Sequence, residues 1–155
     1  MQQTHASNIR KATREDLFDL AILGKQFVRE AKENGYRLTF SQEKFTSSFF
    51  NVIDNLDYLL LVYEIEGEAV GFFLGAVFEP LFSKDLLAVE MFWWVEEDYR
   101  GNRQSLGLLK TFEDWAKEKG ASEVSVSDLQ GVKDLDKLYK RLGYTKSEVT
   151  YKKDL

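Results

Sequence analysis

The chain of 155 residues contains no cysteine, one histidine and one proline. The absence of cysteine excludes a disulfide scaffold, a thiolate zinc or iron–sulfur site and a cysteine nucleophile. The single histidine, His5, lies in an N-terminal tail that we expect to fray, which argues against a Ser-His-Asp triad or a histidine metal site. We therefore expect no bound metal, and any chemistry must use carboxylates, tyrosines, hydroxyls and backbone amides.

Long hydrophobic runs are also missing. No apolar stretch approaches the roughly 20 residues that span a bilayer, and residues 1–11 lack the apolar segment of a signal peptide. We therefore expect a cytoplasmic protein without a membrane partner. The formal net charge of −5 argues against a general nucleic-acid binder and mildly favours cationic partners.

The composition is typical of a folded domain, with 44% hydrophobic, 14% aromatic and 30% charged residues. A chain of this length buries roughly 68–70% of the surface that its unfolded form exposes. No linker, repeat or low-complexity tract interrupts the sequence. Residues 1–155 are therefore predicted to form a single domain.

The periodicity of apolar residues, with turn residues between the periodic segments, predicts a β-α-α-β-β-β-α-β-α-β order. The expected elements are a strand (7–11), two helices (13–34 and 41–54), three strands (58–65, 69–78 and 86–95), a helix (105–119), a strand (123–127), a helix (132–142) and an edge-like strand (144–152). Hairpins followed by βαβ crossovers predict an α/β fold, in which a central mixed sheet carries helices on its faces.

The most informative segment is the turn after the third long strand. This strand ends at Val95, a polar turn carries Arg100 and Gly101, and a long helix begins at once. Such a turn directs backbone N–H groups and a helix N-terminus into one space, which favours an anion. Arg103 adds positive charge, and the Ser105 hydroxyl can cap or donate. The spacing alone is equally compatible with a plain strand-to-helix turn that carries a solvated charge cluster.

At this turn the chain resembles the GNAT family of acetyltransferases, whose acetyl-coenzyme A loop reads [Gln/Arg]-x-x-Gly-x-[Gly/Ala] after a strand and an acidic turn. The segment 95–101 is similar to the approach to that loop. Two positions depart from the pattern, since Arg103 replaces the central glycine and Ser105 replaces the second Gly or Ala. Glycine allows the backbone to approach a pyrophosphate closely. Either the loop shifts, or the Arg103 guanidinium pairs with a phosphate instead.

Four other segments resemble the family in the expected order. They are the opening strand and helix start at 8–16, the hairpin at 67–71, the helix exit at 119–121 and the segment 138–144, which is similar to the family's Phe-Tyr-x-x-x-Gly-Phe. Some bacteriophage-encoded members have similarly degenerate glycine loops and form one candidate subgroup. The resemblance implies a fold with a V-shaped splay between the third long strand and the parallel strand that follows it.

The resemblance also implies a function: an N-acetyltransferase that moves an acetyl group from acetyl-CoA, its cosubstrate, directly to a primary amine. The pantetheine arm would pair with the exposed strand edge, a backbone N–H near its end would stabilise the tetrahedral oxyanion, and the amides of the following loop would hold the pyrophosphate. The cofactor-binding residues would be Trp93, Trp94, Val95, Arg100, Gly101, Asn102, Arg103, Gln104 and Ser105.

Two residues are candidates for proton transfer. Tyr139 matches the family tyrosine that protonates the departing thiolate, and a phenol with a pKa of about 10 suits a thiol leaving group with a pKa of about 8.5. The structural alternative for Tyr139 is packing beneath the last helix.

Glu90 is the candidate base, because an acid inside a hydrophobic strand is costly unless it is hydrogen-bonded or faces a cleft. Strict alternation puts Glu90 out of phase with Val95, so the catalytic role needs a β-bulge; Glu79 and Asp85 are further candidates.

The acceptor is left open by the sequence. Acids near the strand entering the cleft would attract a polyamine, an aminoglycoside or a protein lysine or N-terminus. These acids are Glu79, Asp85, Glu90, Glu96, Glu97 and Asp98, of which 96–98 are better explained as a solvated turn.

The alternative is a GNAT-fold module that binds CoA weakly or not at all and acts by binding a partner. Arg103 and Ser105 in the loop favour this alternative. Exposed edges of the last strands would allow a homodimer.

Overall fold

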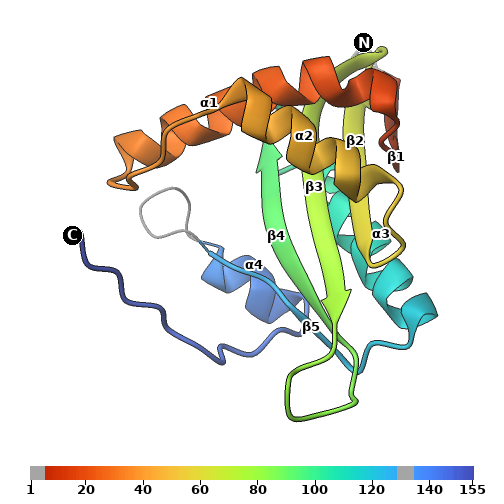
Figure 1. The fold of residues 1–155 in the computed structure, drawn as a ribbon. Coiled ribbons are helices and arrows are strands. Elements are labelled where there is room, and N and C mark those ends of the chain that lie inside the picture. Colours follow the sequence, from red (N-terminus) through yellow and green to blue (C-terminus); the bar gives the residue numbers. More distant parts are fainter. Residues whose placement is uncertain (1–5, 129–134) are drawn as a thin grey trace.

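The computed structural model describes residues 6–128 and 135–155 (Figure 1). Five strands form one mixed sheet in the order β1-β2-β3-β4-β5. The strands are β1 (Ser7–Lys11), β2 (Tyr58–Ile65), β3 (Glu68–Phe78), β4 (Leu87–Val95) and β5 (Glu123–Ser125), and the helices are α1 (Leu17–Glu33), α2 (Gln42–Ile53), α3 (Arg103–Lys119) and α4 (Asp136–Arg141). Helices α1 and α2 cross one face of the sheet and α3 lies behind the other (Figure 1). The expected mixed α/β fold is confirmed.

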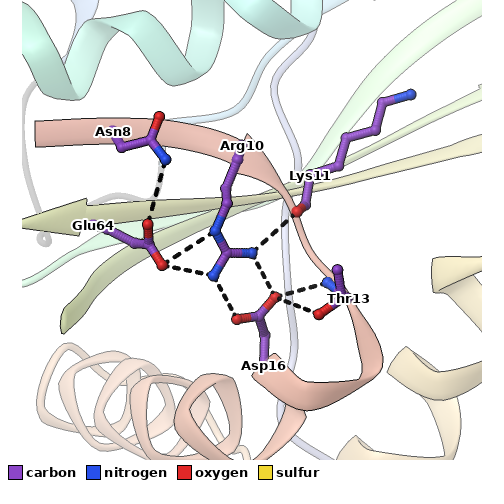
Figure 2. A network of polar contacts seen from close by, with 6 residues as sticks. All are labelled: Asn8, Arg10, Lys11, Thr13, Asp16 and Glu64. Carbon is purple, nitrogen blue, oxygen red and sulfur yellow. Dashed lines mark hydrogen bonds and ion pairs between the residues drawn. The ribbon is translucent and has the colours of Figure 1, made fainter. Parts of the chain in front are cut away.

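A polar network fixes the start of the fold, where β1 turns into α1. The Arg10 guanidinium donates two 2.7 Å hydrogen bonds to the Asp16 carboxylate and also binds Glu64 of β2 (Figure 2). Asp16 in turn accepts the N–H of Thr13 at 2.7 Å, as an acid in a capping box does. The first strand, its neighbour β2 and the first helical turn are thereby joined through one guanidinium.

The pairs β1–β2, β2–β3 and β3–β4 are antiparallel, and the pair β4–β5 is parallel. The β3–β4 ladder contains a shift of one residue, since Leu74 pairs with Phe92 whereas Gly75 pairs with Glu90. Met91 is therefore the extra residue of a β-bulge in β4. This bulge reverses the alternation of side chains along the second half of the strand.

Two hydrophobic cores lie on the two faces of the sheet. The core under α1 and α2 contains Leu20, Phe49 and Phe72, and the core under α3 and α4 contains Phe73, Phe112 and other side chains. Gly75 allows Phe112 of α3 to lie directly on the sheet, because a Cβ at this position would stand 2.3 Å from the Phe112 ring. In the described part of the chain, no helix is both long and apolar enough to cross a membrane.

The expected final strand at 144–152 is wrong. These residues have no regular secondary structure, and Tyr151 is 90% exposed. A strand needs a partner ladder and a face to bury, and this segment finds neither. It is instead tied to the loop after α1 by Lys152, which binds the Gly35 carbonyl, and by an Arg37–Asp154 ion pair at 3.2 Å.

Smaller differences concern the ends of three elements. Helix α3 begins at Arg103, two residues earlier than expected, because Asn102 acts as its N-cap. Strand β5 ends at Ser125 instead of residue 127. The described part of the last helix runs from Asp136 to Arg141, and the expected start at 132–134 lies outside the described residues.

Candidate active site

The sheet opens between β4 and β5, which pair over only three positions, from Leu87 with Glu123 to Val89 with Ser125. Two positions further along, the Ser127 N–H donates at 3.0 Å to Oε2 of Glu90. A side-chain carboxylate thus takes the place that a β4 carbonyl would have in a continued ladder. Together with the bulge at Met91, this substitution ends the pairing and separates the two strands.

Beyond this point β4 presents backbone polar groups to the gap. The Glu96 N–H donates to the Val70 carbonyl at 2.8 Å. In an antiparallel pair every second residue directs its backbone N–H and C=O toward the partner strand, so those of Trp94 also point toward β3. The N–H and C=O groups of Trp93 and Val95 then point away from β3, toward the gap. Of the three strand residues expected to pair with pantetheine, Trp93 and Val95 have suitably directed backbone groups and Trp94 does not.

A cavity of about 340 Å³ occupies the opening. Its walls include Phe27, Ala31, Tyr36 and Leu38 from α1 and the following loop, Glu90 to Val95 from β4, and Ser105, Leu106, Leu138 and Tyr139 from α3 and α4. Because α1 and α3 pack on opposite faces of the sheet, the cavity reaches from one face to the other. Two reactants that entered from opposite faces would therefore meet beside β4.

Glu90 lies in this cavity and is only 8% exposed. It shares a face with Ala88, and the bulge brings Val95 to that same face, as the catalytic interpretation of Glu90 required. Burial raises the pKa of Glu90 to about 7, although the hydrogen bond from Ser127 opposes part of the rise. A carboxyl group with this pKa can exchange a proton near neutral pH.

Tyr139 of α4 also lines the cavity, and its hydroxyl donates to the Ser127 carbonyl at 2.8 Å. Burial, and then the negative charges of Glu90 and Asp128, raise the pKa of Tyr139, so the phenol holds its proton at neutral pH. Glu90 and Tyr139 therefore bind the N–H and the C=O of one residue. The structure brings the two expected proton-transfer residues together, and it also places Tyr139 in the core beneath α4.

Arg100 lies at the cavity but is already engaged. Its Nε donates to the Val95 carbonyl at 2.5 Å, and its two terminal nitrogens donate to the Glu30 carboxylate of α1 at 2.9 and 2.6 Å. The indole of Trp94 donates to the same carboxylate at 2.8 Å. Arg100 thus holds the end of β4 against α1, and its guanidinium is not directed at the loop where a pyrophosphate is expected.

The N-terminus of α3 is capped from within. Asn102 Oδ1 accepts the Ser105 N–H at 2.7 Å, and the Ser105 hydroxyl donates to the Asn102 carbonyl at 2.9 Å. The N–H groups of Arg103 and Gln104 belong to the first helical turn and have no intrahelical acceptor. Gly101 precedes them with a φ of 73°, which favours glycine. Ser105 therefore completes the helix cap, and the N–H groups of Arg103 and Gln104 point out of the N-terminal end of α3.

The other expected acids lie elsewhere. Glu79 and Asp85 are in the connection between β3 and β4, where Asp85 accepts the Ser83 hydroxyl at 2.7 Å, and 96–98 forms the turn after β4. None of them lines the cavity. The sequence interpretation missed Glu30 and Ser127. No local pattern indicates either one, because Glu30 meets its partners 64 and 70 residues further along the chain.

Comparison with known proteins agrees with this geometry. The model of the acetyltransferase (GNAT) family matches residues 25–144. A search of curated proteins gave no match. Among solved structures, a transcriptional regulator from Bacillus halodurans C-125 is similar with a TM-score of 0.79 and 19% identity, over 97% of this chain and 100% of that one.

Two further structures share the fold. The aminoglycoside N-acetyltransferase AAC(6')-Iy in complex with CoA has a TM-score of 0.78 and 15% identity, over 100% and 99% of the two chains. A ribosomal-protein-alanine N-acetyltransferase from Brucella melitensis biovar Abortus 2308 has a TM-score of 0.75 and 16% identity, over 97% and 100%. The matched residues include β4, the turn after it, α3 and the described part of α4. This chain belongs to the GNAT family of acetyltransferases.

Proposed function

We propose that the protein is an acetyl-CoA-dependent N-acetyltransferase that transfers the acetyl group directly to a primary amine. The observation that carries the proposal is the cavity through the sheet, which has a helix N-terminus on one side and Glu90 and Tyr139 along it. Family membership supports the same reaction class. A cytoplasmic location remains part of this proposal.

Acetyl-CoA would enter from the face that carries α3. Its pyrophosphate would lie at the first turn of α3, where the amides of Arg103 and Gln104 are directed outward and a helix dipole favours negative charge. Arg103 is exposed and is the first residue of this turn. Its guanidinium would supply the phosphate contact that the missing glycine would have made through the backbone. The pantetheine arm would pair with the backbone of Trp93 and Val95.

The transfer step needs one proton acceptor and one proton donor. Glu90 takes the proton of the incoming ammonium, directly or through water, and the amine nitrogen attacks the thioester carbonyl. The Val95 N–H, which points into the gap, stabilises the oxyanion. The C–S bond then breaks, and Tyr139 gives its proton to the departing thiolate after its hydroxyl leaves the Ser127 carbonyl. The nitrogen of the intermediate loses its second proton, which returns to the Tyr139 phenolate, and the amide is formed.

One observation favours the alternative, a GNAT-fold interaction module with weak CoA binding. Arg100 occupies the Val95 carbonyl, and the Ser105 amide is used by the helix cap, so two groups that could bind the cofactor are engaged. Cofactor pairing at that carbonyl requires Arg100 to move. The Val95 N–H and the Trp93 backbone need no such change.

Titration calorimetry with acetyl-CoA and an assay of thiol release with a panel of amines test the proposal. We expect Tyr139→Phe to lower kcat by about 10² or more while the Kd for acetyl-CoA stays within a few fold. Tyr144→Phe is the matched control, because Tyr144 donates to Glu113 at 2.6 Å and does not line the cavity. Absence of both binding and transfer in the unmodified protein would favour the interaction module, and equal turnover of both variants would remove Tyr139 from the mechanism.

A further inference from the structure

The wall of the cavity on the α1 side is apolar. Phe27 and Ala31 of α1 and Tyr36 and Leu38 of the following loop line it, and none carries a charge. Phe27 meets Phe92 of β4 edge-on, with ring centroids 5.8 Å apart. An acceptor that approached from this face would therefore pass between aromatic and aliphatic side chains.

Charged groups of the cavity lie away from this wall or are engaged. Arg100 is neutralised by Glu30, and Asp128 accepts the Leu135 N–H at 3.1 Å on the side of α4. Glu90 is the acid of β4 that lines the cavity. One ammonium group of an acceptor would meet Glu90, and the α1-side wall supplies no second carboxylate for another.

The outer edge of the wall carries positive charge. The Lys152 ammonium lies 4.4 Å from the centroid of the Tyr36 ring, and Arg37 is the next residue of the loop. Arg37 is paired with Asp154, whereas Lys152 meets a carbonyl and an aromatic ring. A second cationic group on an acceptor, placed beyond Tyr36, would be repelled by Lys152.

The size of the cavity limits the acceptor further. Its volume of about 340 Å³ is near the lower end of ligand sites, which is about 300 Å³, and the acyl arm must share it. An oligosaccharide-sized acceptor would leave most of its polar groups facing apolar side chains, which is unfavourable.

We infer that the acceptor is a small primary monoamine carried on an apolar body of aromatic or branched aliphatic character, with no second positive charge. This inference rests on the proposed acetyltransferase function. The apolar body would lie against Phe27, Tyr36 and Leu38, and the single amine would reach Glu90.

The test compares 2-phenylethylamine with spermidine, kanamycin and a lysine-containing peptide in the thiol-release assay. We expect kcat/KM for 2-phenylethylamine to exceed that for spermidine and kanamycin at least tenfold, which is the effect of burying a modest apolar surface. A preference for spermidine, kanamycin or the peptide overturns the inference, and so does acetyl-CoA binding without transfer to 2-phenylethylamine. Failure to bind acetyl-CoA would instead refute the proposed function itself.

A charge placed on the wall tests the same inference from the protein side. Leu38→Glu adds a carboxylate at a half-exposed loop position, so we expect kcat/KM to fall at least tenfold for 2-phenylethylamine and to change little or rise for spermidine. Leu56→Glu is the control, because Leu56 is an exposed leucine in the turn before β2 and lies outside the cavity. An equal effect of both variants on 2-phenylethylamine, or no effect of Leu38→Glu, would contradict the assignment of this wall to the acceptor.

Discussion

The buried carboxyl group of Glu90 makes the stability of the protein depend on pH. Burial raises its pKa from 4.5 to about 7. The folded state therefore binds this proton more tightly than the unfolded state does, and stability is lost as the pH rises from 4.5 through about 7. At about 1.4 kcal/mol for each pKa unit, the full loss is about 3 kcal/mol.

Replacing Glu90 with glutamine removes this loss. The amide keeps an oxygen that can accept the Ser127 N–H, but it carries no charge to desolvate. Urea unfolding of both proteins between pH 4.5 and pH 8 should show the free energy of unfolding of the unmodified protein falling about 3 kcal/mol more than that of Glu90→Gln. Glu79→Gln, at an exposed position, controls for the loss of one acidic group.

If the two proteins lost stability equally between pH 4.5 and pH 8, the raised pKa of Glu90 would be refuted, and with it the ability of Glu90 to exchange a proton near pH 7.

The Glu90→Gln variant also tests the catalytic role. We expect kcat/KM of the unmodified enzyme to rise with pH through about 7, as Glu90 ionises, and Glu90→Gln to lose both this limb and about 10²-fold or more in rate. Retention of the limb in the variant would exclude Glu90 as the base.

Three substitutions test the framework around the site. Asp16→Asn should lower the free energy of unfolding by about 1–2 kcal/mol at pH 7, because the bidentate bond from Arg10 loses its charge. Since Arg10 holds the pKa of Asp16 below its usual range, this difference should begin to shrink as the pH falls below about 4 and disappear once the pH has fallen through the lowered pKa; a difference that is unchanged between pH 7 and pH 3 would contradict it. Gly75→Ala should cost about 1–3 kcal/mol, because its Cβ would overlap the Phe112 ring, and an unchanged Tm would show that the ring can move. Asn102→Ala should cost about 1 kcal/mol in urea unfolding through loss of the helix cap, and full stability would show that the cap is dispensable.

The sequence predicted most helices and strands because their signals are local. Apolar periodicity located α1, α2 and the four longer strands of the sheet, and the left-handed residues Glu66 and Gly67 form the expected turn between β2 and β3. The turn at Arg100 and Gly101 carried enough of the family pattern to identify it. The expected last strand was wrong because a strand needs a partner ladder, and residues 144–152 have none.

The contents of the site depended on contacts between distant parts of the chain. Arg100 was expected near a phosphate, yet it binds Glu30, which lies 70 residues away. Glu90 reaches the cavity face through a bulge whose position depends on pairing with β3. No spacing rule in a single sequence specifies either arrangement.

The sequence by itself therefore determined the order of the elements as far as the last helix, the family resemblance and the two candidate proton-transfer residues, Glu90 and Tyr139. Only the tertiary structure decided that both bind the backbone of Ser127, that β4 and β5 separate there, and that the wall facing α1 is apolar. The physical reason is that secondary structure follows from neighbours in the chain. Burial, pKa and the shape of a cavity instead follow from side chains that meet only after the sheet and helices have packed.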